Sequence, residues 1–151
     1  MLTFQVERWN QIRGELDPVM KDHWEEMPFD PALPLRLDEE FYAAMDRMGK
    51  LHVVTARDGP RLVGYFIGFL CRHPHYEIQV ANMDVYFLLP EYRKAANGVR
   101  LFMEFEKTAK ARGVGFLLAT ARPDQNRSAE LIFERLGWKL ARALYSKRIG
   151  G

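Results

Sequence analysis

A short stretch between an apolar segment and a helical pattern has the composition of an anion-binding turn. It runs from Arg93 through Lys94 to Gly98, with two alanines and an asparagine between them. The N-terminus of a helix leaves backbone N–H groups without intrahelical partners and carries a partial positive charge. Small residues there let a phosphate approach the backbone closely, and Arg100 adds a further cation. An ordinary strand-to-helix turn with solvated cations explains the same residues, so both interpretations stand.

The elements around this turn follow from the apolar periodicity. Residues 2–6 alternate as a strand does, and two short helices are expected next, over residues 9–16 and again from Asp17, with Pro18 at its first helical position. The proline-rich residues 27–37 predict a loop. Asp38 then caps a helix that has Phe41, Met45 and Met48 on one face and ends at Gly49.

The second half of the chain is predicted to be richer in strands. Two β-rich runs flank Asp58-Gly-Pro60 as an antiparallel hairpin, and residues 76–90 add a third strand. A helix then runs to Gly113, followed by a buried strand, a helix with its apolar stripe over residues 129–136 and a closing strand or strand pair over residues 138–149. This order indicates a mixed α/β fold in a single domain, residues 1–151. Its strand-helix-strand crossover places the cationic turn where ligands tend to bind.

Composition narrows the class of protein. The chain has 151 residues and a formal net charge of +2 with both signs interspersed, which argues against nucleic acid as the main partner. The single Cys71 excludes an intramolecular disulfide and suits a reducing compartment. The sequence has no run of 18 apolar residues and no secretory pattern at its start, so we expect a cytoplasmic protein without a membrane partner. His73 and His75 lack a third ligand at a recognisable spacing, so no metal is predicted, and Cys71 is expected in the core.

Two segments carry a resemblance to a known family. The spacing of Ala129, Phe133, Gly137 and Trp138 in "NRSAELIFERLGW" resembles that of the Gcn5-related N-acetyltransferases, the GNAT superfamily. The segment "LLPEYRKAANGVRLF" is similar to the acetyl-coenzyme A loop of that family, with Ala96 in place of the first glycine. The stretch "HYEIQVANMDVYFLLPEYR" also resembles acetyltransferase-like proteins encoded by bacteriophages.

The resemblance implies a fold and a reaction. The fold would be a mixed, mostly antiparallel sheet of six to seven strands flanked by about four helices. The reaction would be direct transfer of acetyl from acetyl-coenzyme A to a primary amine, on a small molecule or a protein, in a ternary complex. A homodimer paired through the last strands is common in the family. The residues implied in coenzyme binding are Leu88, Leu89, Arg93, Lys94, Ala95, Ala96, Asn97, Gly98, Val99 and Asn126.

The amine must lose a proton, for which a carboxylate is a suitable base. Asp84 matches an acidic position of many family members, although it could equally be a strand-end carboxylate paired with a Lys or Arg; Glu77 is the reserve. Many members carry a tyrosine at the position of Phe133 to protonate the departing thiolate. Tyr86 or Tyr145 could replace it, unless they are simply buried tyrosines with satisfied hydroxyls.

The acceptor side and the activity itself each leave two interpretations open. In such a fold the acceptor site would draw on His23, Trp24, Glu25 and Glu26, which could equally be an exposed helical charge cluster. Because of Ala96 and Phe133, the alternative to an enzyme is a GNAT-like structural or interaction module with weak or no catalysis, conceivably virion-associated.

Overall fold

The computed structural model describes residues 1–122 and 127–150, and the chain divides into two compact units, Met1–Ala119 and Thr120–Gly151. The first unit contains a sheet and three helices, α1 to α3. The second contains α4, Ser128–Arg135. That residues 1–151 act as one domain stays a prediction.

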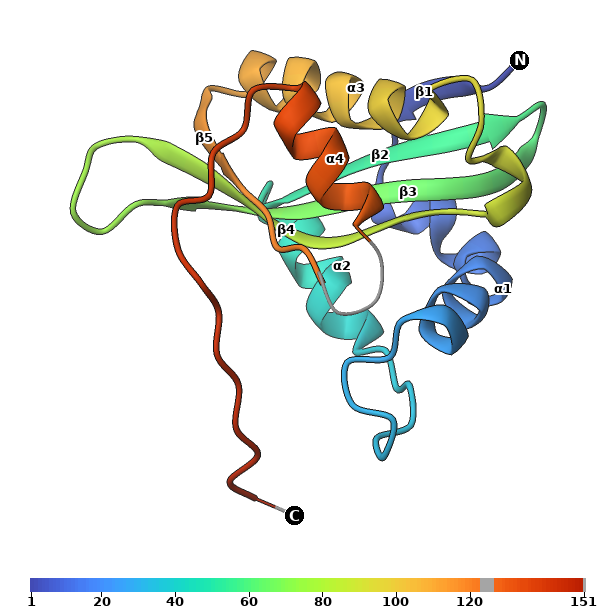
Figure 1. The fold of residues 1–151 in the computed structure, drawn as a ribbon, viewed down its shortest axis with the longest axis horizontal. Coiled ribbons are helices and arrows are strands. Elements are labelled where there is room, and N and C mark those ends of the chain that lie inside the picture. The colour runs from blue at the N-terminus through green and yellow to red at the C-terminus, as the bar shows by residue number, and fades with distance from the viewer. Residues whose placement is uncertain (123–126, 151) are drawn as a thin grey trace. The chain divides into compact units, whose positions relative to one another are not determined.

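The sheet has five strands in the described residues. They are β1 Thr3–Val6, β2 Leu51–Asp58, β3 Arg61–Arg72, β4 Gln79–Leu88 and β5 Val114–Leu118, and they lie in the order β1-β2-β3-β4-β5 (Figure 1). All neighbours are antiparallel except β4 and β5, which are parallel and joined by α3. The mixed, mostly antiparallel α/β fold with four α-helices is confirmed within the described ranges, but six to seven strands is wrong.

The missing strands are those predicted over residues 138–149. No strand forms between Trp138 and Gly150, and the large apolar side chains of this segment are 80–94% exposed: Leu140, Leu144, Tyr145 and Ile149. A strand gains its stability from a paired edge and a buried face. Residues 138–149 alternate basic and apolar side chains but have neither a paired edge nor a buried face. The local pattern alone therefore does not produce a strand.

The first helix corrects a second expectation. Residues 9–26 form one helix, α1 Trp9–Glu26, with Pro18 in its interior, rather than two short helices. A proline inside a helix removes one hydrogen bond and costs about 3 kcal/mol. The buried side chains continue on both sides of it, from Ile12 and Leu16 to Val19 and Met20. Burying one continuous apolar stripe on the sheet offsets the lost hydrogen bond.

Helices α2 Glu39–Arg47 and α3 Asn97–Ala111 begin and end close to where the sequence predicts. Asp38 caps α2 by accepting a hydrogen bond from the Phe41 amide, and Gly113 follows α3 with φ +83°. The predicted face of α2 is partly wrong: Phe41 and Met48 are largely exposed, whereas Tyr42 packs on the core with Met45.

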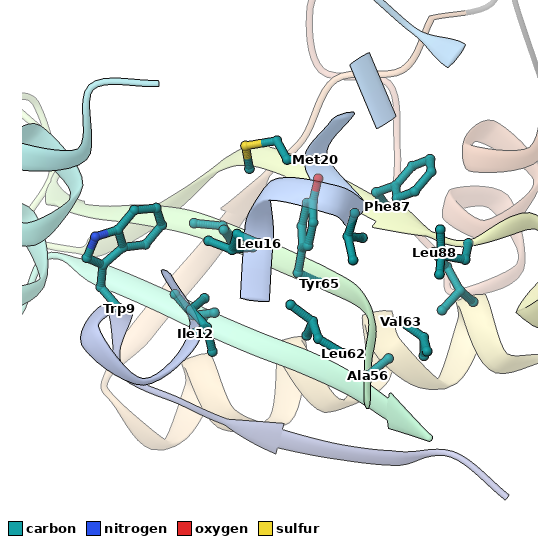
Figure 2. Close-up of a cluster of buried hydrophobic side chains, with 14 of the residues drawn as sticks. Trp9, Ile12, Leu16, Met20, Ala56, Leu62, Val63, Tyr65, Phe87 and Leu88 are labelled. Atoms are coloured by element: carbon teal, nitrogen blue, oxygen red, sulfur yellow. The ribbon is translucent and has the colours of Figure 1, made fainter. Parts of the chain in front are cut away.

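The sheet separates two layers of helices. Helices α1 and α2 cover one face and α3 covers the other (Figure 1). On the first face, Tyr65 and Phe87 join the apolar stripe of α1 in the cluster drawn in Figure 2. On the second face, the ring centroids of Phe66 and of Phe105 in α3 are 3.8 Å apart. Neighbouring residues of β3 thus serve opposite layers, as strand geometry requires.

Candidate active site

An irregularity in β4 sets the direction of its only carboxylate. Consecutive residues Ile67 and Gly68 of β3 pair with Val85 and Met83 of β4, so Asp84 is the extra residue of a β-bulge. Regular alternation would send Asp84 to the same face as Tyr86, whose ring packs on Phe102 of α3. The bulge brings Asp84 to the opposite face, where its carboxylate meets α2. Bulges re-aim side chains in this way and are frequent beside active sites.

Asp84 is bonded to a tyrosine and not to a cation. The hydroxyl of Tyr42 donates to Oδ2 of Asp84 over 2.5 Å, and within the described residues this carboxylate has no Lys or Arg partner. The alternative of a strand-end ion pair is therefore wrong for this part of the chain. Burial raises the pKa of Asp84, while the hydrogen bond from Tyr42 opposes the rise. A half-buried carboxylate with a raised pKa has the character of a general base.

Beside Asp84, one edge of β4 is open to a ligand. Strand β5 pairs with β4 only from Gln79 to Asn82. The Leu89 amide donates to the Val63 carbonyl, which makes the adjacent pair of Leu88 and Gly64 a non-hydrogen-bonded pair of the antiparallel ladder. The N–H and C=O of Leu88 consequently point away from β3, toward the open edge. Leu88 can therefore offer its amide to a ligand, whereas the amide of Leu89 is already used.

The turn that follows presents a group of free amides. Helix α3 begins at Asn97, and the Arg100 amide donates to the carbonyl of the N-cap residue Ala96. The amide of Asn97 donates to the Lys94 carbonyl. Within the described residues, the remaining amides of the turn meet no acceptor: those of Lys94, Ala95, Ala96, Gly98 and Val99. Such a set at a helix N-terminus fits a pyrophosphate.

Two alanines of this turn have left-handed backbones. The φ angles are +52° at Ala95 and +58° at Ala96, and Ala96 is the N-cap of α3. The position that holds glycine in the family's pattern is thus strained for the alanine present here, and not already helical. Since the backbone reaches this conformation without glycine, the cradle of amides is nevertheless formed.

Arg93 holds the turn in place through its guanidinium, and its predicted role in coenzyme binding stays a prediction. Its Nε donates to the Leu88 carbonyl over 2.7 Å, its two terminal nitrogens pair with Glu26 over 2.8 and 2.7 Å, and its guanidinium lies 5.1 Å from the centre of the Phe87 ring. Arg100 similarly lies over the Phe4 ring. Lys94 is exposed and unpaired in the described residues, so it is the cation best placed for an anion.

The other catalytic candidates lie apart from Asp84. Glu77 precedes β4 at the hairpin tip, where its exposed carboxylate pairs with Arg72 over 3.2 Å. Residues 79–83 of β4 lie between it and Asp84, an extended length of roughly 17 Å. Tyr86 faces α3, and burial raises its pKa strongly. The structure thus brings neither residue to the carboxylate of Asp84.

Of the residues expected at the acceptor site, His23 belongs to the core. It is 5% exposed, its Nδ1 lies 2.8 Å from the Tyr65 hydroxyl, and its ring stacks on Phe87. Burial lowers the pKa of His23 to about 4. Trp24 packs edge-on to His23, Glu25 is an exposed partner of Lys21, and Glu26 is the partner of Arg93. The charge-cluster interpretation fits the exposed Glu25 and Glu26 but not the buried His23.

The predictions on the second unit concern three residues. The ring of Phe133 stacks on Trp138 at 4.9 Å, and Tyr145 is 91% exposed. Asn126 lies outside the described residues. The roles expected for Tyr145 and Asn126 stay predictions.

Metal chemistry finds no support in the described residues. No three side chains of His, Cys, Asp or Glu gather there as a metal ion would need, and His73 and His75 only pack on each other and on Tyr76. Cys71 is exposed, so its expected place in the core is wrong. Among the described helices, none has both the length and the apolar character to cross a bilayer.

Sequence reasoning missed Tyr42, the partner of Asp84. It follows the helix cap Asp38 by four residues, and the predicted apolar face of this helix included the neighbouring Phe41 instead. A polar aromatic residue among apolar ones was the available signal, but the pairing spans 42 residues of sequence.

The described part of the chain thus has a mixed α/β sheet with an open edge on β4, a half-buried carboxylate beside that edge and free amides at the start of α3. This arrangement fits an acyltransferase. The acetyltransferase (GNAT) family matches residues 16–138, and the chain belongs to this family. GNAT acetyltransferases use acetyl-coenzyme A. Membership classes the protein as an acyltransferase.

Solved structures agree on the fold at low sequence identity. An aminoglycoside acetyltransferase from an uncultured soil metagenomic sample has a TM-score of 0.81 and 11% identity, and the match covers 99% of both chains. The ribosomal-protein-alanine N-acetyltransferase of Brucella melitensis biovar Abortus 2308 has a TM-score of 0.76 and 15% identity over 99% of this chain and 100% of that one. A predicted acetyltransferase of Clostridium acetobutylicum, solved with acetyl-coenzyme A, has a TM-score of 0.74 and 9% identity over 98% and 96%. No curated protein matches the sequence.

Proposed function

We propose that the protein is an N-acetyltransferase that transfers acetyl from acetyl-coenzyme A to a primary amine by direct attack in a ternary complex. The observation that carries the proposal is the position of Asp84: the bulge turns its half-buried carboxylate to one side of β4, within four residues of the open Leu88 edge. Acetyl-coenzyme A would supply an activated thioester.

Asp84 would take the proton of the acceptor. An alkylamine has a pKa near about 10.4 and must lose a proton before or during attack on the carbonyl carbon. The raised pKa of Asp84 makes its carboxylate a stronger base than an exposed aspartate. The amine nitrogen forms the new C–N bond, the C–S bond breaks, and the leaving sulfur takes up a proton from a donor that the described residues do not identify.

The backbone would hold the coenzyme and stabilise the developing charge. The free amides from Lys94 to Val99 fit its pyrophosphate, with Lys94 as the nearby cation. The open edge of β4 fits the pantetheine arm as an added strand, since the Leu88 amide points there, while the Leu88 carbonyl already accepts a hydrogen bond from Arg93. The Leu88 amide is also the donor available for an oxyanion, an interaction usually worth a few kcal/mol.

A second candidate is a GNAT-like module that binds or assembles without catalysing transfer. It is favoured by the strained Ala96 in the coenzyme turn and by Phe133, which has no proton to give. The likeness to bacteriophage proteins, a virion-associated role and a homodimer stay predictions. The proteins with similar solved structures are named for acceptors as different as a ribosomal protein and an aminoglycoside. The acceptor class of this protein therefore has to be found by experiment.

A thiol-release screen of amines with acetyl-coenzyme A tests the proposal. We expect free thiol with at least one amine and none without it, and Asp84→Asn should lower turnover about 100-fold or more with little change in coenzyme binding. Asp58→Asn is the matched control, because Asp58 also accepts a tyrosine hydroxyl, that of Tyr92, away from Asp84.

Binding is measured separately as thermal stabilisation. Acetyl-coenzyme A at 100 times its dissociation constant should stabilise the fold by about 2.7 kcal/mol. No stabilisation at millimolar coenzyme would reject the enzyme proposal, whereas stabilisation without amine-dependent thiol release would favour the module.

A further inference from the structure

The hydroxyl of Tyr42 is the one hydrogen-bond donor that reaches the Asp84 carboxylate within the described residues. It binds Oδ2 and leaves Oδ1 without a partner in the same part of the chain. The two residues lie on different elements, α2 and β4, so their meeting depends on the packing of α2 against the sheet.

The aromatic ring of Tyr42 is held on both sides. It stacks on the buried Trp9 of α1 with the centroids 4.6 Å apart and the planes 13° apart. Phe69 of β3 lies 5.7 Å away on another side. The cap at Asp38 fixes the first turn of α2 just before it. Because ring and helix are both fixed, the hydroxyl has a set direction toward β4.

Few ionisable groups surround this pair. Tyr42 of α2 contacts Asp84 directly, and Tyr65 of β3 interacts electrostatically with both Tyr42 and Asp84. His23 of α1 contacts the hydroxyl of Tyr65 and not the pair itself. Burial strongly raises the pKa values of both tyrosines, so both are neutral donors at ordinary pH. With no cation among its partners in the described residues, Asp84 relies on the Tyr42 hydroxyl to favour its charged form.

We propose that Tyr42 is a positioning residue for the acetyl transfer: its hydroxyl fixes Oδ2 of Asp84, and so presents Oδ1 to the acceptor amine. The inference rests on the proposed function, because it assigns Asp84 the role of base. A tyrosine hydroxyl suits this task, since it orients a carboxylate without neutralising it as a lysine or arginine would.

The test is Tyr42→Phe, which keeps the ring on Trp9 and removes only the hydroxyl. Asp84 then loses the hydrogen bond that favours its charged form. Its pKa, measured by NMR titration of the carboxyl carbon in the free protein, should rise. The acidic limb of the pH profile of kcat should move to higher pH, and kcat near neutral pH should fall about tenfold, with KM for acetyl-coenzyme A unchanged.

Tyr65→Phe is the matched control. It removes another buried tyrosine hydroxyl on the same face, one that is hydrogen-bonded to His23 and interacts with Asp84 only electrostatically. Because Tyr65 is neutral at ordinary pH, this change should move the Asp84 titration much less than Tyr42→Phe does. An unmoved Asp84 titration in Tyr42→Phe, or an equal loss of turnover at every pH, would overturn the inference, because both indicate a merely structural role. If the titration moves while wild-type protein transfers acetyl to no amine, the proposed function fails and the effect of Tyr42 on Asp84 is confirmed.

Discussion

The left-handed backbone of Ala96 allows a quantitative prediction about the stability of the turn before α3. At φ +58° and ψ 21° its side chain lies close to the backbone, a conformation that costs an L-residue about 1–2 kcal/mol and costs glycine almost nothing. Ala96→Gly should relieve that strain in the folded protein without moving the turn, because glycine accepts the same angles.

The net gain is smaller than the strain. Glycine gives the unfolded chain more freedom, which costs about 0.4–1 kcal/mol of stability. The difference leaves Ala96→Gly more stable than wild type by about 0.5–1 kcal/mol. For a chain of this length, that is a rise in melting temperature of about 2 °C. The free amides keep their arrangement, so coenzyme binding should be retained.

Chemical and thermal denaturation measure the effect, with Ala111→Gly as the matched control. Ala111 is the last residue of α3, exposed and helical, so the same substitution there should destabilise, by less than the roughly 0.5–1 kcal/mol of a mid-helix position. The two variants should therefore shift the free energy of unfolding in opposite directions. If Ala96→Gly destabilises as Ala111→Gly does, the turn is not strained in solution and the argument is refuted.

Three further predictions concern the surroundings of the site. Burial lowers the pKa of His52 to about 4 from an ordinary 6.5. The contribution of His52 to stability is therefore full above pH 6.5, and the free energy of unfolding falls by at most about 1.4 kcal/mol per pH unit as pH drops toward 4. Denaturation of His52→Gln should show a weaker dependence of this free energy on pH, and an unchanged dependence would contradict the prediction. Arg93→Lys loses the forked pairing with Glu26, and calorimetry should show acetyl-coenzyme A binding about tenfold more weakly; unchanged affinity would show that the clamp is dispensable. Gly64→Ala places a Cβ 2.7 Å from the Phe87 carbonyl oxygen and should lower the free energy of unfolding by about 1–3 kcal/mol, measured by denaturation. In the control Gly115→Ala no atom lies closer to the new Cβ than 3.8 Å, so the loss should be smaller. Equal losses would argue against the clash.

Much of the fold is encoded locally and could be predicted from the sequence. Apolar residues with periods of two and about 3.6 locate β1, β2, β3, β4, α3 and β5, and turn residues locate their ends, as at Asp58-Gly-Pro60 and Gly113. The small-residue turn before α3 is likewise a local signal, and its free amides follow from its place at a helix N-terminus.

The predictions that failed depended on contacts between distant segments. By local rules Asp17 and Pro18 begin a new helix, but the buried stripe of α1 continues across them. The alternation in residues 138–149 resembles a strand, but no described strand pairs with it. The pairing of Arg93 with Glu26, 67 residues earlier in the chain, was likewise invisible to local rules, and the role of Arg93 in coenzyme binding stays a prediction.

The sequence by itself therefore determined most of the elements, the family and the position of the small-residue turn before α3, because each of these is a pattern of neighbouring residues. The tertiary structure decided what Asp84 does. Its face depends on a bulge in the pairing of β4 with β3, and its partner depends on the packing of α2, which brings Tyr42 to it across 42 residues. Strand register and helix packing are set by the summed burial of the whole core, and a local pattern carries no record of either.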